Sequence, residues 1–337
     1  MQCKKIKTAH GIIETPALLP VSAASYGVWD LWIEKKFPAP WDLAQGTVLS
    51  LYHILQYRKK EEILEKGIHK VLKTKKPVII DSGGFQFMKK NAELEEEFVL
   101  RYQERSGCDI GMTFDYPILP DLSPEEKENR MKKSIYNSNL ALKLKKNKKM
   151  LLYSAVHGHS PEDIKKYIKN LDDGFDGYAV GSLVPKKRDY NMLINVISAA
   201  KNEKPLHVFG ITGFPALFAL SYMGVETFDS WTYLVAAAFK EYIDPETLKR
   251  LRLRRVKELP ECECPICRDY GLNDFLQSTS EAEILLALHN LSIFLEEMKN
   301  VREKIRENEL ESYILKKGEK NLSIKKAFMI ARKYKGS

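Results

Sequence analysis

Short apolar runs recur along the chain, and amphipathic or charged stretches separate most of them. Eight of these runs have the length and composition of buried strands. They are Ala17–Val21, Thr47–Ser50, Pro77–Asp81, Asp109–Asp115, Leu151–Val156, Gly177–Gly181, Leu206–Gly210 and Thr227–Ser230. Each run is bounded by polar or turn-forming residues, so we expect a separate strand from each.

Helical patterns lie between most of these strands. They are Glu61–Thr74, Leu94–Arg105, Pro124–Lys145, Pro161–Leu171, Asn191–Lys201 and Phe214–Met223. Strands that alternate with helices indicate parallel β-α units. Eight such units in a chain of this length favour a closed barrel over an open sheet. The predicted fold class is therefore α/β, a (β/α)8 TIM barrel.

Polar residues close several of the predicted strands. Asp81, Asp115, His157, Ser182 and Asp229 all lie at carboxyl ends of strands. In a parallel barrel these ends share one rim, where the loops carry the chemistry. Any one of these residues could simply cap a following helix. Five polar strand ends on one rim are harder to explain by capping alone.

Two of these strand ends suggest acid–base and nucleophilic chemistry. The third strand ends in Asp81-Ser-Gly-Gly-Phe-Gln86, whose glycines let the backbone approach a flat ligand, with Phe85 beside it. The same run could also be a tight turn from strand to helix. Phe228-Asp-Ser230 closes the eighth strand, and we expect Asp229 to face Asp81. Two such carboxyl groups can divide the roles of nucleophile and acid in breaking a glycosidic bond.

A cysteine cluster follows the predicted barrel. Cys262, Cys264 and Cys267 lie within six residues, and His289 follows in the helix-like segment 282–298. Three thiolates and one imidazole form a closed tetrahedral set for a structural Zn²⁺. Free or disulfide-bonded cysteines are the alternative. We predict a barrel domain over residues 1–245, a zinc-binding subdomain over 246–300, and a basic helical tail over 301–337.

Composition and charge narrow the class of partner. The chain of 337 residues is 44% hydrophobic and 29% charged, as in ordinary soluble proteins, and its net charge is +9. Basic residues gather in one strip: Lys249, Arg250, Arg252, Arg254, Arg255 and Lys257. Eight more lie in the tail from Lys316 onward, against one acid. Such clustering favours a nucleic acid, although a solvated lysine-rich surface explains the tail equally well.

The sequence also indicates a cellular compartment and contains one tryptophan-rich segment. The first ten residues hold no export-type apolar run, and no segment has the ~18 consecutive apolar residues that span a membrane. With five cysteines in this pattern, we expect a reducing cytoplasm, or a host cytoplasm if a phage encodes the chain. Trp29, Trp32 and Trp41 lie among lysines and could stack on exposed bases or form a local core.

These motifs resemble the tRNA-guanine transglycosylase superfamily. The resemblance rests on Asp81–Gln86, Tyr178–Gly181, His207–Gly210, Phe228–Ser230 and the cysteine cluster with His289-Asn290, in the family's order. The second half is most similar to the archaeal branch. The resemblance implies a barrel with a zinc subdomain that exchanges guanine in a polynucleotide for a 7-deazaguanine base of the preQ0 type. It also implies no organic cofactor, and subunits that pair as a homodimer through the zinc region.

The resemblance also implies residue roles. Asp229 corresponds to the nucleophile that holds the sugar, Asp81 to the proton shuttle, and Asp115 to the residue that binds the amino edge of the base. The implied substrate-binding residues are Ser82, Gly83, Phe85, Gln86, Asp115, His157, Gly158 and Gly177. The basic strip lies between the nucleophile and the cysteines in sequence, so its cations could bind flanking phosphates.

Two departures from the family favour DNA over tRNA as the polymer. The family carries a base-contacting Gln-Gly pair where this chain has His157-Gly158, followed by His159. A helix cap or a phosphate contact could also explain these histidines. Archaeal tRNA enzymes usually continue into RNA-binding domains, whereas this sequence ends at Ser337. We therefore expect the DNA-modifying branch, with archaeosine- or queuosine-type tRNA exchange as the alternative.

Two other classes of function remain open. One is a non-catalytic subunit that keeps the zinc site, as one eukaryotic member of the superfamily does. The other is a zinc-stabilised nucleic-acid-binding module without chemistry, which the basic tail and the cysteine cluster would suit. A non-catalytic subunit would be expected to lack the nucleophile, whereas Asp229 is present. A binding module leaves the acids at strand ends unexplained, since carboxylates disfavour phosphate.

Overall fold

A computed structural model describes residues 2–22, 28–34, 36–183 and 189–336. The chain divides into two compact units. The barrel unit contains Lys4–Gly210 and Val225–Asp229, within the described ranges. The C-terminal unit contains Ile211–Gly224 and the described residues from Ser230 onward, with the N-terminal residues before Lys4. The domain boundaries expected from the sequence remain a prediction.

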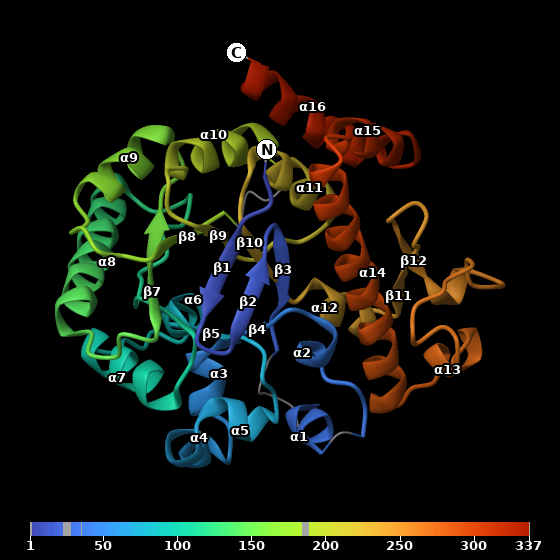
Figure 1. The fold of residues 1–337 in the computed structure, drawn as a ribbon, viewed down its shortest axis with the longest axis horizontal. Coiled ribbons are helices and arrows are strands. Elements are labelled where there is room, and N and C mark those ends of the chain that lie inside the picture. The colour runs from blue at the N-terminus through green and yellow to red at the C-terminus, as the bar shows by residue number, and fades with distance from the viewer. Residues whose placement is uncertain (1, 23–27, 35, 184–188, 337) are drawn as a thin grey trace. The chain divides into compact units, whose positions relative to one another are not determined.

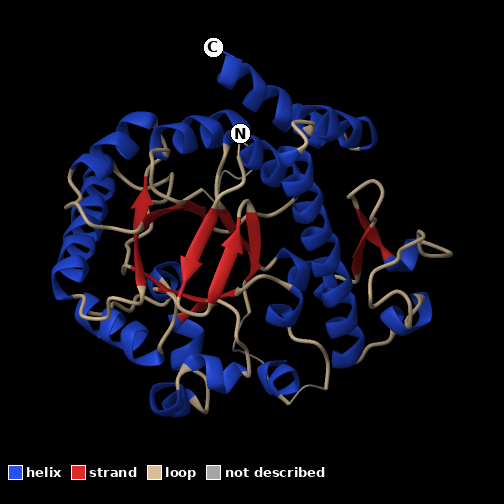
Figure 2. Cartoon of the chain, viewed as in Figure 1, coloured by secondary structure: helices blue, strands red, loops and turns tan. Residues whose placement is uncertain are grey.

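Eight parallel strands form the centre of the barrel unit (Figures 1 and 2). They are β3 (Ala17–Pro20), β4 (Thr47–Ser50), β5 (Val78–Asp81), β6 (Ile110–Met112), β7 (Leu151–His157), β8 (Gly177–Gly181), β9 (Leu206–Val208) and β10 (Thr227–Ser230). Their order is β3-β10-β9-β8-β7-β6-β5-β4. A parallel bridge between Val21 and Val48 joins β3 to β4 and closes the ring. The predicted (β/α)8 barrel is confirmed, with all eight strands where the apolar runs indicated.

The sequence predicts some of the helices of the barrel unit. They are α1 (Val28–Ile33), α2 (Pro40–Leu43), α3 (Leu51–Leu55), α4 (Lys60–Lys66), α5 (Ile68–Leu72), α6 (Gly84–Lys89), α7 (Glu96–Ser106), α8 (Pro124–Leu144), α9 (Pro161–Lys169) and α10 (Tyr190–Ala200). Helices α4, α5 and α7–α10 lie in the predicted segments, whereas α1, α2, α3 and α6 were not predicted. Ser123 and Ser160 accept N–H bonds at the starts of α8 and α9, each followed by proline. The helix predicted over Glu61–Thr74 is instead two helices, because Gly67 adopts φ +84°.

A β-hairpin that the sequence analysis missed closes the amino end of the barrel. Strands β1 (Lys5–Thr8) and β2 (Gly11–Glu14) pair antiparallel. Ile6 and Ile13 are buried from this hairpin and join the barrel's central apolar cluster. The rest of that cluster comes from the strands: Ala17, Leu19, Val48, Ile79, Ile110, Met112, Tyr153 and Ala179. The amino end of the barrel is thus a packed core, and the polar strand ends lie at the carboxyl end.

A buried acid fixes the hairpin to the strand starts. Asp109 is fully buried, and its two oxygens accept bonds from the side chains of His10 (3.0 Å) and His69 (2.9 Å). The backbone N–H groups of His10 and Val78 donate to the same carboxylate. Burial alone would raise the pKa of Asp109, but these hydrogen bonds and the His69 charge lower it to about 2. Asp109 is therefore an ionised anchor.

The tryptophan-rich segment is a local core. Trp29, Trp32 and Trp41 are each at most 1% exposed and meet edge to face. Trp29 Nε1–H also donates to the carbonyl of Ser22. The alternative of base stacking by these indoles is wrong, because their rings are not accessible.

The C-terminal unit is mainly helical. Its elements are α11 (Phe214–Met223), α12 (Thr232–Ala238), β11 (Glu241–Ile243), β12 (Arg250–Arg252), a 3-10 turn (Leu253–Arg255), α13 (Leu272–Leu276), α14 (Ser280–Arg306), α15 (Leu310–Lys320) and α16 (Leu322–Gly336). Helix α14 packs against α12, and α16 packs against α11 and α15. Helix α14 crosses the expected boundary at residue 301, because its buried face continues through Val301 to Ile305. Among the described residues, no helix is both long and apolar enough to cross a membrane.

We predict that Asp109→Asn lowers the free energy of unfolding at pH 7 by about 2 kcal/mol. The folded-state pKa lies below the unfolded value of about 3.9, so the carboxylate stabilises the fold above pH 4. That contribution is lost as the pH falls toward 2. Urea unfolding at several pH values measures the difference, with exposed Asp121→Asn as the control. An equal loss at pH 2 and pH 7 would contradict the prediction.

Candidate active site and metal centre

The predicted polar strand ends meet at one rim of the barrel unit. Asp81 ends β5, and His157 ends β7 opposite Gly181 of β8. Asp229 lies on β10, and Asp115 follows β6 by three residues. Asp115, His157 and Asp229 are at most 7% exposed. The rim thus gathers three acids from strands far apart in sequence, of which Asp115 and Asp229 are buried and Asp81 is half-buried.

Mutual repulsion shapes the electrostatics of these acids. Burial raises the pKa of Asp81 well above its usual value, and the negative charges of Asp115 and Asp229 raise it further. Hydrogen bonds from the backbone N–H groups of Gly83 and Ser82 oppose this effect only in part. Like charges in one pocket disfavour ionisation of all of them together. Asp81 is therefore the acid of the group that most readily keeps a proton.

The two glycines after Asp81 are required by close backbone contacts. Gly83 has φ +80°, and a Cβ there would lie 2.9 Å from the backbone nitrogen of Tyr52. A Cβ on Gly84 would lie 2.4 Å from the carbonyl oxygen of Asp115 and 2.5 Å from its Oδ1. Strand end and pocket acid are therefore held together by backbone packing. The segment Asp81–Gln86 therefore forms a tight turn from strand to helix and also lies against the pocket acid Asp115.

Asp115 is held by side chains from two other strand ends. Ser82 Oγ–H donates to Asp115 Oδ1 at 2.6 Å. His157 Nε2 lies 2.8 Å from Asp115 Oδ2, and His157 Nδ1 lies 2.9 Å from Ser182 Oγ. Ser182 Oγ also accepts the N–H of Ile118 at 2.8 Å. These contacts form one continuous polar network across β5, β7 and β8.

Asp229 is held by a backbone N–H group and lies near a buried histidine. The backbone N–H of Gly210, just after β9, donates to Asp229 Oδ1. His207 Nε2 lies 3.6 Å from the same oxygen, and its Nδ1 bonds Thr227 Oγ1 at 3.0 Å. The His207 ring is fully buried. The contacts with Gly210 and His207 both engage Oδ1 of Asp229.

The remaining predicted binding residues divide into two groups. Phe85 and Gln86 are half-buried on α6, and Gly158 follows His157 directly. A Cβ on Gly158 would lie 2.6 Å from Asp163 Cβ, so helix packing explains that glycine. Gly177 begins β8 opposite Tyr153, four residues before the rim. The assignment of Gly177 to the pocket is therefore not supported by its place on the strand, and Ser182 occupies the rim instead.

Sequence reasoning missed Glu96 of α7. This carboxyl group is 3% exposed and accepts the N–H of Phe114 at 2.6 Å, next to Asp115 in sequence. Burial raises the pKa of Glu96 well above its usual value, and the Asp115 charge adds to that effect. An acid on a helix carries no local signal that distinguishes it from a solvent-exposed one. Only the tertiary fold brings it beneath the site.

The basic strip lies on the surface of the C-terminal unit. Lys249, Arg250, Arg252, Arg254, Arg255 and Lys257 are all exposed. Arg250 and Arg252 also approach Glu241 across the β11–β12 pair, at 3.4 and 4.0 Å. In the tail, Lys317 and Lys320 form ion pairs with Glu297 and Glu246. Part of the tail's charge is thus satisfied within the unit, whereas the strip presents a row of cations.

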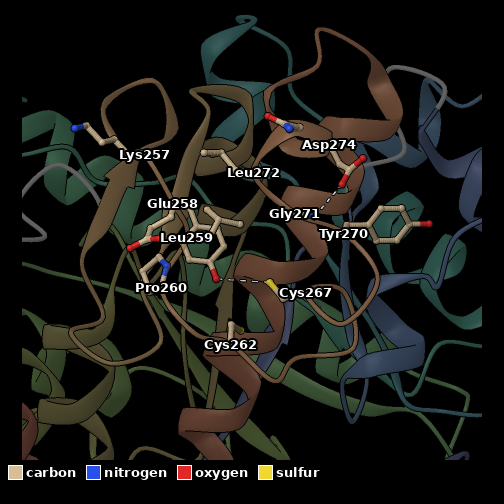
Figure 3. A pocket seen from close by; sticks show the side chains of 12 residues that line it. Lys257, Glu258, Leu259, Pro260, Cys262, Cys267, Tyr270, Gly271, Leu272 and Asp274 are labelled. Atoms are coloured by element: carbon tan, nitrogen blue, oxygen red, sulfur yellow. Dashed lines mark hydrogen bonds between the residues drawn. The ribbon is translucent and has the colours of Figure 1, made fainter.

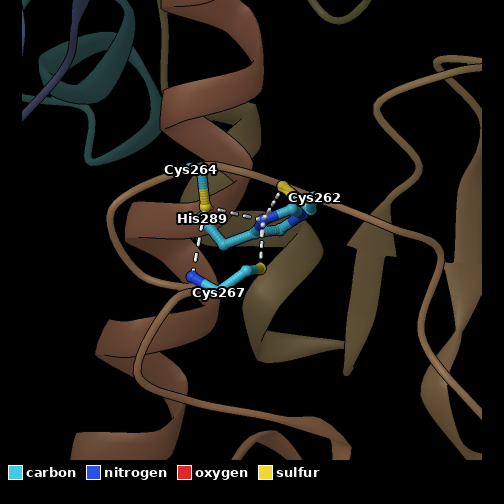
Figure 4. Close-up of side chains that lie close together, drawn as sticks. All are labelled: Cys262, Cys264, Cys267 and His289. Carbon is cyan, nitrogen blue, oxygen red and sulfur yellow. Dashed lines mark hydrogen bonds between the residues drawn. The ribbon is translucent and has the colours of Figure 1, made fainter.

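The four predicted metal ligands come together (Figure 4). His289 Nδ1 lies 3.8, 3.4 and 3.2 Å from the sulfurs of Cys262, Cys264 and Cys267. Ligands about 2.1–2.3 Å from one tetrahedral ion are separated by about 3.5 Å. The donor set and its spacing therefore fit a closed structural Zn²⁺ site. When bound, such an ion would crosslink the cysteine loop to helix α14.

Further contacts orient these ligands. His289 Nε2–H donates to the carbonyl of Ile243 at 2.9 Å, which leaves Nδ1 free to bind a metal. Tyr242 stacks on the His289 ring at 3.8 Å and directs its hydroxyl to Cys267 Sγ at 3.6 Å. The backbone N–H of Cys267 points to Cys264 Sγ at 3.4 Å. A cavity of about 500 Å³ beside the cluster is lined by Cys262 and Cys267 (Figure 3), so solutes can reach the thiols.

We predict that Cys264→Ser removes a bound zinc ion. The purified protein should carry about one Zn²⁺ per chain, and the variant close to none, because a hydroxyl is a poor replacement for a thiolate. Elemental analysis measures the content, and thermal melting should show a lower transition temperature. Cys3→Ser lies outside the cluster and should keep the metal. Equal zinc in both variants would exclude the assigned site.

We also predict that Asp81→Asn stabilises the fold at pH 8. The folded-state pKa of Asp81 is raised, so ionising this group costs stability as the pH rises above the unfolded value of about 4. Asparagine removes that cost. The melting temperature should rise at pH 8 and stay unchanged at pH 4, while exposed Glu65→Gln changes neither. A lower melting temperature at pH 8 would show that the carboxyl is not under repulsion.

Comparison with known proteins identifies one family and several archaeal relatives. A sequence model of the family described as queuine tRNA-ribosyltransferase matches residues 2–321. The chain is 32% identical to the tRNA-guanine(15) transglycosylase of Methanococcus aeolicus, over 91% of this chain and 48% of that protein. It is 31% identical to the protein of the same name from Archaeoglobus fulgidus, over 91% and 64%. For that of Methanocaldococcus jannaschii the values are 30%, 96% and 50%.

The chain thus spans about half to two thirds of the length of the curated relatives it matches. The match covers the barrel strands, the rim acids and the cysteine cluster alike, since it runs from residue 2 to residue 321. The resemblance noted in the sequence is confirmed, including its archaeal character. The chain belongs to the queuine tRNA-ribosyltransferase family.

Proposed function

We propose that the protein is a guanine transglycosylase that exchanges a guanine base in a nucleic acid through a covalent bond between Asp229 and the sugar. The observation that carries this proposal is the gathering of Asp81, Asp115 and Asp229 at one barrel rim, in three different environments. Asp81 has a raised pKa, Asp115 contacts the side chains of Ser82 and His157, and Asp229 accepts a backbone N–H. Base exchange needs these three roles.

The first half-reaction breaks the bond to guanine. A carboxylate oxygen of Asp229 attacks C1′ of the sugar, and the C1′–N9 bond breaks with its electron pair going to the base. Asp81, whose pKa is raised by burial and by the charges of Asp115 and Asp229, gives its proton to the departing guanine. The enzyme then holds the sugar as an ester of Asp229, with Asp81 ionised.

The second half-reaction reverses these steps with a new base. Asp81 takes the proton from N9 of the incoming base, and N9 attacks C1′. The C1′–O bond to Asp229 breaks and its electron pair returns to the carboxylate. The ester keeps the energy of the original glycosidic bond, so exchange needs no organic cofactor. We propose a 7-deazaguanine as the incoming base, as the family resemblance implies.

We propose that Asp115 reads the base. A carboxylate accepts two N–H groups at once, and guanine offers N1–H together with its 2-amino group. Gly83 and Gly84 keep the wall beside it flat, and Phe85 supplies an aromatic ring at the start of α6. Guanine must leave the base stack to reach this site, at a cost of about a few kcal/mol.

The comparisons favour tRNA over DNA as the polymer. The three curated relatives named above are all called tRNA-guanine(15) transglycosylases, and the matched family is named for tRNA. The DNA preference drawn from the sequence is therefore not supported, and the alternative becomes the proposal. The His157 substitution does not favour DNA, because that side chain contacts Asp115 rather than open space.

The exposed basic strip is proposed to contact phosphates of the polymer. Lys249 precedes β12, Arg254 and Arg255 lie in the turn after it, and all three side chains are exposed. Phosphate contacts add affinity without reading sequence, and they weaken with salt. A binding module without chemistry would use the same strip. The acids of the rim favour an enzyme instead, since they would repel a backbone bound for its own sake.

The test is incorporation of radiolabelled guanine into tRNA and into duplex DNA. We expect label in tRNA from the wild type, and at least a 1,000-fold lower rate from Asp229→Asn, which loses the nucleophile. The wild type stalled without an incoming base should form a denaturation-resistant adduct with tRNA. Exposed Asp121→Asn is the control. Label in neither polymer would reject the enzyme, and label only in DNA would restore the first preference.

A further inference from the structure

Helix α12 of the C-terminal unit has an apolar side that no described part of that unit covers. The helix contains no charged residue. It packs against α14 and β11, and its buried side chains include Tyr233, Ala236 and Ala237. The other side carries a second apolar set, which we call the α12 stripe: Trp231, Leu234, Val235, Ala238 and Phe239. Positions i, i+3, i+4, i+7 and i+8 share one face of a helix, so this set is continuous.

The α12 stripe is open to solvent, most of all at its two ends. Trp231 is 53% exposed and Phe239 is 74% exposed. Ala238 is exposed as well, and Leu234 and Val235 are half-buried. Single exposed apolar residues are common on protein surfaces, but a contiguous apolar patch is typical of a binding surface. A helix that is apolar on every side is normally buried, so the stripe fits a partner that covers it.

A cation borders the amino end of the stripe. Arg250 Nη2–H donates to the carbonyl of Thr212 at 3.2 Å. The carbonyl of the preceding residue, Ile211, accepts the hydroxyl of Ser230. Ser230 directly precedes Trp231. These contacts bring the exposed Arg250 side chain close to the start of α12.

A second cation borders the carboxyl end. The backbone N–H of Leu253 donates to the carbonyl of Lys240 at 3.0 Å, and Lys240 directly follows Phe239. Arg254 comes next after Leu253 and is exposed. Burial lowers the pKa of Lys240, and the charge of Arg254 lowers it further against the opposing charge of Glu283. The Arg254 charge therefore lies near the Phe239 end of the stripe.

Exposed aromatic rings bordered by arginines fit a single-stranded polynucleotide. Its bases stack on aromatic rings, and its phosphates bind the cations beside them. Trp231 and Phe239 are eight residues apart, which is about 12 Å along a helix axis. Stacked nucleotides are spaced by about 3.4 Å, so roughly three or four of them would cover this length.

The charges disfavour a second copy of the chain as the partner. Two copies that meet through the same face would bring the arginines of both copies together. Like charges placed opposite one another weaken such an interface. The net charge of +9 adds to this repulsion, whereas it attracts a polyanion.

We propose that the α12 stripe is a stacking platform for unpaired nucleotides, with bases on Trp231 and Phe239 and phosphates on Arg250 and Arg254. This inference rests on the proposed function for the class of polymer. It adds contacts with bases, which the basic strip by itself does not provide. Trp231 follows Asp229 by two residues, so their Cα atoms are at most about 7 Å apart. The stacked nucleotides are therefore neighbours of the exchanged guanine.

The test uses tryptophan fluorescence and a single-stranded RNA octamer of uridines. All four tryptophans lie in the described ranges, and three of them are at most 1% exposed, so only Trp231 can stack on a base. The octamer should quench the fluorescence of the wild type at low salt. Polyphosphate, which has no bases, should bind without quenching. Trp231→Phe should bind a dye-labelled octamer about as tightly as the wild type, without the quenching.

Substitutions at the two ends separate ring stacking from apolar docking. Trp231→Ala and Phe239→Ala should each weaken the affinity for the octamer about tenfold. Phe239→Leu keeps apolar area without an aromatic ring and should bind as weakly as Phe239→Ala, whereas Phe239→Tyr should bind like the wild type. Phe98→Ala is the matched control, because Phe98 of α7 is 45% exposed and lies outside the stripe. Thermal melting checks that each variant is folded.

Four results would overturn the proposal. They are no quenching in the wild type, unchanged octamer affinity in Trp231→Ala and Phe239→Ala, wild-type affinity in Phe239→Leu, or a wild-type dimer in sedimentation that Trp231→Ala turns into a monomer. The last result would assign the stripe to a second copy. The octamer contains no guanine, so its binding does not depend on base exchange. The expected binding pattern without label in any polymer would reject the proposed function and leave the platform standing.

Discussion

Closure of eight parallel strands is the constraint on which the site depends. All carboxyl ends then share one rim, so acids separated by up to 148 residues come together. Gathering like charges is unfavourable, and the fold offsets it with donors specific to each carboxylate. The backbone N–H of Gly210 donates to Asp229 and the Ser82 hydroxyl donates to Asp115, while burial and the neighbouring charges raise the pKa of Asp81. Division of chemical labour follows from this unequal distribution of donors.

The amino end of the barrel also buries a carboxylate, but there it anchors the fold. Asp109 is buried as deeply as any rim acid, but two imidazoles and two backbone N–H groups donate to it. Its charge is therefore fully satisfied, and it ties the β1–β2 hairpin to the strand starts. Acids at the rim are only partly satisfied. Stability is concentrated at the amino end, and reactivity at the carboxyl end, as expected for this architecture.

The C-terminal unit has its own organising centre. Without a large sheet, its cysteine loop depends on ligands held by α14 and on the stacked pair of Tyr242 and His289. A metal crosslink suits such a loop, because few apolar residues of the segment 256–274 are buried. The exposed cations of β12 and the following turn belong to the same unit. The candidate metal ligands and the exposed cations thus lie in one small piece of structure.

The sequence by itself determined the strands, most helices, the rim acids and the cysteine cluster. These features depend on local pattern: apolar runs between turn residues, and ligands at fixed spacing. Tertiary structure alone decided the burial of Ile6 and Ile13 in the barrel core, the place of Gly177 at the amino end of β8, and the burial of Glu96. It also decided that both nitrogens of His157 face protein. The direction and partner of a side chain depend on neighbours distant in sequence, and no local pattern contains that information.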